Sequence, residues 1–294
     1  MKFNILSNRT KGIIFIIFSA FGFAAMSACV KLAGDLPSFQ KTFFRNLVSL
    51  VVALILVLKS KESLFGKKEN QITLLTRSIL GTIGIVCNYY AIDKMTHLSD
   101  ATMLNKLSPF FVIIFSAIFL REKINSKQIT GLIIAFIGTL FVVRPTFDMS
   151  MIPALAGILG GLSAAGAYTC VRYLGGKEKS QTIVFYFSFC STIIIAPIMI
   201  MTYKSMSISQ FLCLMAAGIF ASIGQFGITL AYGFAPAREI SIFDYTNILF
   251  AAIFSFTLFG IWPDALSFIG YGIIFMASLY MFLYNRKLDK IESK

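Results

Sequence analysis

The sequence has 294 residues, of which 57% are hydrophobic and 13% are charged, and its mean hydropathy is +0.81. Water-soluble domains carry about 25% charged residues, so this composition excludes a soluble protein. The net charge of +13 does not indicate nucleic-acid binding, because the basic residues lie between apolar runs, where they orient membrane spans.

Ten apolar runs predict an all-α integral membrane protein. Crossing a ~30 Å hydrocarbon layer takes about 20 apolar residues, and each run is bounded by charged residues, Gly or Pro. We expect the first run to be a span, because no signal-peptide cleavage site follows it. Short loops leave little chain for a soluble catalytic domain. In chain order the predicted spans cover residues 12–33, 42–58, 77–95, 101–120, 128–144, 152–171, 182–203, 209–231, 238–259 and 264–284.

The basic residues also predict which way the spans point. Nineteen of the 26 lysines and arginines fall on one side, in the tails and alternate loops, and five fall on the other. Arg45 and Lys106 lie inside spans. Because cytoplasmic loops carry the excess of Lys and Arg, we expect residues 1–11 and 285–294 to be cytoplasmic tails of a protein in the cytoplasmic (plasma) membrane.

The two halves of the chain match each other when the sequence is shifted by about 140 residues. At an offset of 141, Cys29-Val30-Lys31 falls on Cys170-Val171-Arg172, and at 140, Gly84 falls on Gly224. Each half holds five spans, an odd number, so the repeats must be inverted in the membrane. Inverted repeats place a shared site near the midplane and can expose it to each side in turn. The predicted repeats cover residues 12–144 and 152–284.

Short motifs occur at places typical of one family of carriers. They are Phe44-Arg45-Asn46, Tyr90-Ala91, the run from Ala101 to Pro109, Leu120-Arg121-Glu122-Lys123, Gly131 with Gly138, Phe185-Tyr186-Phe187-Ser188, and Gly270 with Gly272. With these motifs the chain resembles, over nearly its whole length, the EamA-type carriers of the drug/metabolite transporter superfamily. The resemblance implies transport of metabolites such as amino acids, nucleobases or vitamins. It implies transport without ATP, because no GxxxxGK[ST] phosphate loop occurs.

Two departures from the family pattern mark the second half as a diverged copy. The family's Pro is absent from the ninth span, where Ile248 and Leu249 stand at the place that would repeat Pro109. The acidic residue after that span is replaced around Ile261-Trp262. Family roles are therefore transferred less safely to this half.

Charged residues inside spans are the first candidates for a substrate site, because each costs about 2.5–3.5 kcal/mol to insert. Lys106 and Asp244 each lie ~9 Å inside their spans, from opposite ends, at 1.5 Å per residue. In a ~30 Å core the two charges should then lie roughly 10 Å apart in depth, a gap that suits a zwitterionic ligand better than a direct salt bridge. Lys106 could instead extend to the interface. Asp244 is also the candidate for proton coupling, and Arg45 is expected to anchor a neighbouring carbonyl or carboxylate.

Polar residues at helical spacing extend this site, since polar stripes are costly in lipid and should face protein or a water-filled cavity. Pro109 is expected to bend its span near the site. Tyr89, Tyr90 and Tyr245 could stack on a flat ligand or anchor helix ends. A face of small residues on the span that carries Tyr168 indicates close helix packing. The candidate substrate-binding residues are Lys106, Asp244, Asn105, Asn247, Ser241, Asn88, Gln225, Tyr232 and Tyr168.

These features predict a secondary transporter with alternating access, whose cargo is a zwitterionic or amphipathic metabolite such as an amino acid or derivative. The alternative is an efflux carrier for drugs and other cationic compounds, with Asp244 as the dominant buried carboxylate. A membrane enzyme is not expected, because His97 is the single histidine and no acid/base pair accompanies it. We expect no metal or cofactor, since the five cysteines lie in spans without CxxC spacing. The expected partners are a small-molecule substrate and the bilayer, and the sequence leaves cargo, direction, coupling and a monomeric or homodimeric state open.

Overall fold

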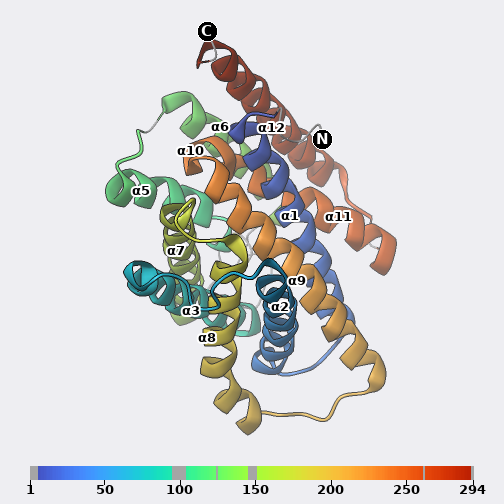
Figure 1. Ribbon diagram of the computed structural model, residues 1–294. Coiled ribbons are helices and arrows are strands. Elements are labelled where there is room, and N and C mark those ends of the chain that lie inside the picture. Colours follow the sequence, from blue (N-terminus) through green and yellow to red (C-terminus); the bar gives the residue numbers. More distant parts are fainter. Residues whose placement is uncertain (1–5, 95–103, 124, 145–150, 261, 293–294) are drawn as a thin grey trace.

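The computed structural model describes residues 6–94, 104–123, 125–144, 151–260 and 262–292. Every element of regular secondary structure in these ranges is a helix (Figure 1). In chain order the elements are α1 (Asn8–Leu32), α2 (Ser38–Ser60), the 3-10 helix η2 (Lys68–Asn70), α3 (Gln71–Lys94), α5 (Ser108–Leu120), α6 (Ser126–Val143), α7 (Met151–Leu174), α8 (Ser180–Met201), α9 (Ile208–Phe234), α10 (Ala237–Ile240), the 3-10 helix η3 (Ser241–Tyr245), α11 (Thr246–Phe259) and α12 (Ala265–Glu292).

The helices have the length and surface of membrane spans. Among the described residues, nine helical segments are long and apolar enough to cross a membrane, and the shorter α5 is apolar as well. Large apolar side chains such as Ile55, Phe119, Ile200 and Phe275 are more than half exposed. A surface of this kind is a liability in water and is expected against lipid. The predicted all-α membrane architecture is therefore confirmed.

The two halves of the chain pack against each other in reciprocal pairs. Helix α1, the first span of the first half, packs against α9, the third span of the second half, and α7 packs against α3 in the same way. Helix α1 also contacts α11 as α7 contacts α5, while α2 packs against α8 and α6 against α12. Figure 1 shows α1 in blue beside α9 in orange, and both chain ends near the same end of the bundle. Two inverted halves related by a pseudo-two-fold axis produce this pairing.

Glycines allow the paired helices to approach closely. A Cβ on Gly22 of α1 would lie 2.6 Å from the backbone nitrogen of Gly224 on α9, and Ser19 donates a hydrogen bond to the Gly224 carbonyl at 2.8 Å. At the matching crossing, a Cβ on Gly84 of α3 would lie 3.3 Å from the Gly160 carbonyl oxygen of α7. Side chains at these positions would push the helices apart and weaken the packing on which membrane helices depend.

Two predicted spans are interrupted, one in each half. In the first half a turn at Lys106 and Leu107 precedes α5, and Pro109 lies in the first turn of that helix. This position suits Pro, whose missing N–H has no partner there in any case, so the predicted bend is confirmed. In the second half η3 interrupts the chain before α11 although no Pro is present. Lys106 and Asp244 each lie two residues before the helix that follows the break.

Helix boundaries differ from the predicted ones where polar residues dilute an apolar run. Helix α3 begins at Gln71 and not at residue 77, so Arg77 lies six residues inside the helix and not at the predicted start of the span. The charge bias between the two sides does not depend on this one residue. Helix α12 continues past residue 284 to Glu292.

Candidate functional site

A direct ion pair joins the two breaks in the middle of the bundle. The Nζ atom of Lys106 lies 3.3 Å from Oδ2 of Asp244. The expected gap of roughly 10 Å was wrong, because it assumed that both spans were continuous helices with a rise of ~1.5 Å per residue. Each span is instead broken at the matching place in its half, and the two breaks lie at the same depth in the bundle. Lys106 does not extend to the membrane interface.

Tyr245 fixes the geometry of this pair from the second half. Its hydroxyl donates a hydrogen bond of 3.0 Å to the backbone carbonyl of Lys106, and its side chain is fully buried. A helix break leaves carbonyls without helical partners, and a buried one needs another donor. Tyr245 therefore supports the break and is not free to stack on a ligand.

The ion pair is loosely held and partly accessible. The Lys106 side chain is 10% exposed and that of Asp244 is 18% exposed. Among the described residues, no second group donates a hydrogen bond to the Asp244 carboxylate, which has further acceptor positions. A buried charge normally collects several hydrogen bonds, so this pair has capacity for another ligand.

Small residues of α7 support the segment that carries Lys106. A Cβ on Gly157 would lie 2.8 Å from a methyl carbon of Leu104, and one on Gly161 would lie 3.1 Å from the Leu104 carbonyl oxygen. The interpretation of this face as a close packing surface is confirmed. Leu104 is buried, and α7 thereby fixes the chain just before the break.

Three further candidates lie close to the pair. The Tyr168 and Tyr232 rings stack at 5.7 Å between centroids, and the Tyr232 hydroxyl lies 3.4 Å from Oγ of Ser241. Ser241 begins η3, which carries Asp244. Asp244 follows Ser241 by three residues in η3, so the two side chains lie on the same side of this 3-10 helix. The structure thus brings Ser241, Tyr232 and Tyr168 together beside the element that carries Asp244.

The other candidates are placed differently. The Asn247 amide donates to the Ala20 carbonyl of α1 at 2.9 Å, and Gln225 accepts a hydrogen bond from Arg77. Asn88 of α3 lies against Gly160 of α7. Asn105 is half-buried in the segment before the break. Thr102, the expected continuation of the polar stripe, and His97 lie outside the described residues.

Arg77 is a buried charge that the sequence analysis missed. Its side chain is 1% exposed, and its Nη2 donates to Oε1 of Gln225 at 3.0 Å. The guanidinium carbon lies 3.7 Å from the centroid of the Phe187 ring. The predicted span begins at Arg77, and the polar residues from Gln71 to Thr76 hid the start of the helix, which placed this charge at the end of the span and not inside it.

Arg45 has a different environment from the one expected. The side chain is 4% exposed, and its Nε has no hydrogen-bond partner. Within the described part of the chain, no carboxylate lies within ion-pair distance of Arg45 and no carbonyl accepts a hydrogen bond from it. The carbonyl or carboxylate partner predicted for Arg45 is therefore not found among the described residues.

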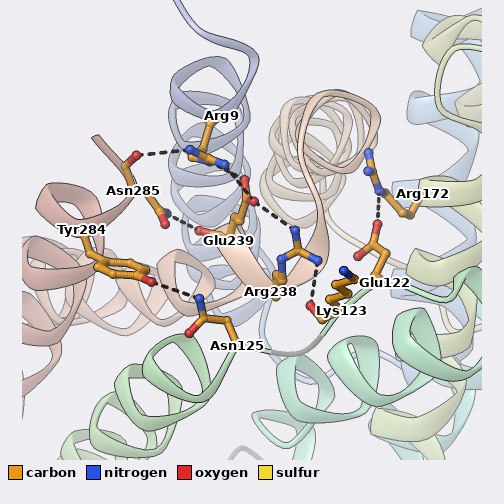
Figure 2. Close-up of polar contacts among 9 residues, drawn as sticks. All are labelled: Arg9, Glu122, Lys123, Asn125, Arg172, Arg238, Glu239, Tyr284 and Asn285. Atoms are coloured by element: carbon orange, nitrogen blue, oxygen red, sulfur yellow. Dashed lines mark hydrogen bonds and ion pairs between the residues drawn. The ribbon is translucent and has the colours of Figure 1, made fainter. Parts of the chain in front are cut away.

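A network of buried ion pairs closes the end of the bundle that carries both chain termini. Figure 2 shows Arg9 of α1 with both Nε and Nη2 on the Glu239 carboxylate of α10, at 2.6 and 3.2 Å. The Asn285 amide of α12 donates to the Glu239 backbone carbonyl at 2.9 Å. Arg9, expected in the cytoplasmic tail, is instead buried in the first turn of α1. The contacts among Arg9, Glu239 and Asn285 join the first span to the ninth and tenth.

Neighbouring contacts extend this network to the other helices. Arg172 of α7 donates from Nε to Glu122 at 2.7 Å and from Nη1 to the Tyr232 carbonyl at 3.1 Å. Arg238 donates to the Lys123 carbonyl at 2.7 Å, as Figure 2 also shows. The contacts of Arg172 with Glu122 and of Arg238 with Lys123 each join one half of the chain to the other.

The opposite end of the bundle is joined by exposed groups. Lys204 pairs with Asp35 at 3.2 Å, and the Asp35 side chain is 99% exposed. Arg144 pairs with Asp264, and the Arg144 guanidinium, followed by the Ser267 backbone N–H, holds the pKa of the Asp264 carboxyl well below its usual range.

The fold and the site define a class of protein: a polytopic helical membrane protein of two inverted halves, with an ion pair between them at matching helix breaks. The chain belongs to the EamA-like transporter family, whose pattern matches residues 10–144 and again residues 151–283. It is therefore a membrane transporter and not an enzyme.

Known proteins of several organisms are similar to the chain along most of its length. The "Pseudopaline exporter CntI" of Pseudomonas aeruginosa is 30% identical over 278 residues, covering 94% of this chain and 97% of the exporter. The "Riboflavin transporter" of Brucella anthropi is 28% identical over 275 residues, with 88% and 94% covered. A crystal structure of another protein has the same fold, with a TM-score of 0.81 at 15% identity, covering 95% of this chain and 99% of that one.

Proposed function

We propose that the protein is a secondary carrier that moves a small zwitterionic or amphipathic metabolite, an amino acid or a derivative of one, by alternating access. The observation that carries the proposal is the Lys106–Asp244 pair, with its 3.3 Å contact at matching breaks of the two halves. In inverted-repeat carriers, broken helices near the midplane form the substrate site.

A zwitterion can replace this ion pair without leaving a charge unbalanced. Its ammonium group would bind Asp244 and its carboxylate would bind Lys106, so that each protein charge exchanges one partner for another. Removing only one partner of such a pair leaves the other charge uncompensated, which for this partly exposed pair costs about 1–2 kcal/mol. A ligand with both charges avoids this cost, which supports a zwitterionic cargo over a simple cation or anion.

The two ends of the bundle would open alternately around this site. Cargo can move toward the termini only if the contacts at that end change. Arg172 would separate from Glu122, and Arg9 and Glu239 would either separate or move together with their helices. At the other end the exposed Lys204–Asp35 and Arg144–Asp264 pairs present a smaller barrier, because exposed pairs contribute about 0–1 kcal/mol each.

The location and orientation form part of the proposal. The excess of Lys and Arg on the side of the termini supports cytoplasmic tails in a plasma membrane. Labelling of single cysteines placed at positions 2 and 290 by an impermeant reagent tests the orientation. Reaction in intact cells would contradict it, and reaction only after permeabilisation is expected.

The named relatives do not define the cargo. One is called an exporter of pseudopaline and another a transporter of riboflavin, so this architecture accommodates different molecules. The cargo of the present protein has to be found by experiment. A metabolite library screened by thermal stabilisation of the purified protein identifies ligands, because any molecule that binds the native state raises its melting temperature.

Transport of such a ligand by site variants tests the assignment of the pair. In proteoliposomes, Asp244→Asn and Lys106→Met should each reduce uptake to background while the purified proteins remain folded. Lys204→Met and Asp35→Asn, which alter the exposed pair at one end, are matched controls and should transport normally. Full transport by both site variants would refute the assignment.

Efflux of cationic compounds is a second candidate, favoured by the greater exposure of Asp244 than of Lys106. The two functions differ in their dependence on the lysine. A cation carrier needs Asp244 and should keep or gain transport in Lys106→Met, whereas the proposed zwitterion carrier loses it. If Asp244 also carries a proton, transport stops when the pH gradient is collapsed, and it continues under facilitated exchange.

A further inference from the structure

Two buried arginines near the middle of the bundle have no carboxylate partner among the described residues. Arg45 of α2 is 4% exposed and Arg77 of α3 is 1% exposed. The ion pairs of the described chain include neither of them. A charge at such depth in a span is costly without a partner and is retained where it has a function.

Helix α8 contacts the segments that carry both arginines. Phe187 lies under the Arg77 guanidinium, and Ser191, one helical turn further on, accepts a hydrogen bond of 2.8 Å from Asn46, the neighbour of Arg45. Ser49, one turn after Arg45 on α2, contacts Ser222 of α9 at 3.1 Å, and Gln225, one turn further along α9, accepts the hydrogen bond from Arg77. Since α8 begins at Ser180, its contacts with Arg77 and Asn46 lie about 10–17 Å into the helix at 1.5 Å per residue, in the middle part of a ~30 Å core.

Helices α2, α3 and α8 carry several buried donors without a hydrogen-bond partner. Nε of Arg45, Nε and Nη1 of Arg77, and the hydroxyls of Ser188 and Thr192 on the same helix α8 are buried without a hydrogen-bond partner. Each unsatisfied buried donor is destabilising, and more so when it is charged. A ligand that brings acceptors and negative charge removes this destabilisation.

Neighbouring side chains fix the position of the Arg77 guanidinium and leave some of its donors available to such a ligand. Phe187 covers one face at 3.7 Å, and Gln225 accepts from one nitrogen, which leaves the others free. A Cβ on Gly81 would lie 2.7 Å from Nη1 of Arg77, so glycine at this position leaves room for the group. A planar guanidinium matches the two oxygens of a carboxylate.

Helix α9 links this region with the site of the Lys106–Asp244 pair. Gln225, the partner of Arg77, lies two turns before Tyr232 on α9, and Tyr232 contacts Ser241 of η3, which carries Asp244. Thr42, one turn from Arg45, lines a cavity of about 190 Å³ between α2, α3 and α7. The cavity lies toward the end of the bundle opposite the termini, where α2 begins.

We propose that Arg45 and Arg77 bind carboxylate groups of the transported molecule, so that the cargo is a zwitterion with at least one additional carboxylate. The inference rests on the proposed function, because it treats the arginines as part of the same translocation site. Lys106 and Asp244 would hold the zwitterionic part, and the arginines would hold the acidic extension.

The probes that test this inference are succinate and its neutral analogue succinamide, which both lack the ammonium group that Asp244 would bind. Succinate is expected to raise the melting temperature of the purified protein, and succinamide is not. Arg45→Met and Arg77→Met should each weaken succinate binding about tenfold or more, since a hydrogen bond to a charged group contributes about 1.5–3 kcal/mol. The exposed Arg144→Met is the matched control and should bind succinate as the wild type does.

Lysine variants serve as controls for loss of the fold. Arg45→Lys and Arg77→Lys keep the charge without the planar fork, and they should bind succinate with an affinity between those of the wild type and the Met variants. An equal response to succinate and succinamide would overturn the inference, as would unchanged succinate binding in both Met and Lys variants. A shift by chloride or phosphate as large as that by succinate would also overturn it, since the site would then bind inorganic anions.

The variants of the ion pair separate this inference from the proposed function. Asp244→Asn should keep the response to succinate and lose the response to a zwitterionic cargo. If the zwitterion response depends on Asp244 while succinate never binds, the inference fails and the proposed function stands. If succinate binds through the arginines while Asp244→Asn and Lys106→Met still transport the cargo, the proposed function fails.

Discussion

Two buried ion pairs join the same halves of the molecule but differ in how they are built. Arg9 and Glu239 make two hydrogen bonds, at 2.6 and 3.2 Å, and Asn285 supports both residues. Lys106 and Asp244 make one contact of 3.3 Å and are partly exposed. The densely bonded pair at the end of the bundle stabilises one conformation. The singly bonded pair in the middle can exchange partners, which suits a substrate site.

The largest effect on stability is expected from Glu239→Gln. The substitution removes the carboxylate that Arg9 contacts, and breaking a buried pair costs about 3–5 kcal/mol. Chemical denaturation of the purified protein in detergent measures the change in the free energy of unfolding. The double variant Arg9→Met/Glu239→Met should recover most of the loss. A loss by Glu239→Gln no larger than that of an exposed pair would remove the contrast between the two regions.

A smaller loss of stability is expected from Asp244→Asn, although it abolishes transport. One contact of 3.3 Å and a partly exposed carboxylate place its cost between those of buried and exposed pairs, at about 1–2 kcal/mol. The same denaturation measurement, paired with transport in proteoliposomes, checks both effects. A stability loss as large as that of Glu239→Gln would mean that both pairs are structural.

The smallest effect is expected from Arg144→Gln at the opposite end, where the pair with Asp264 is exposed. Because Arg144 lowers the pKa of Asp264 in the folded protein, the pair stabilises the fold above the unfolded pKa of about 3.9 and loses this effect as the pH falls below it. The melting temperatures of wild type and variant should therefore differ slightly at pH 7 and converge toward pH 2. A difference that grows on acidification would contradict the role of this carboxylate.

The sequence predicted the architecture because membrane spans follow from hydrophobicity and length alone. It also predicted the bend at Pro109, since that residue cannot continue a helix interior. The second break, at η3, carries no such signal, because tertiary contacts such as that between Tyr245 and the Lys106 carbonyl hold it in place. The depths assigned to Lys106 and Asp244 were wrong for this reason.

The candidate site was predicted in part. Lys106, Asp244, Ser241, Tyr232 and Tyr168 were selected from polar residues inside apolar runs, and the structure places them together. Among the lysines and arginines at span ends, the buried ones could not be told from the solvated ones, because local hydropathy is similar for both. Arg77 and the Arg9–Glu239 pair depend on which helices pack together, and those contacts join residues far apart in the chain.

The central claim is that the Lys106–Asp244 pair binds the cargo and is not required for the fold. The double variant Lys106→Met/Asp244→Asn tests it most directly, since removing both charges of a buried pair is often neutral for stability. We expect a melting temperature above that of Asp244→Asn and near that of the wild type, with no stabilisation by the cargo identified in the library screen. A double variant that the cargo still stabilises would contradict the claim.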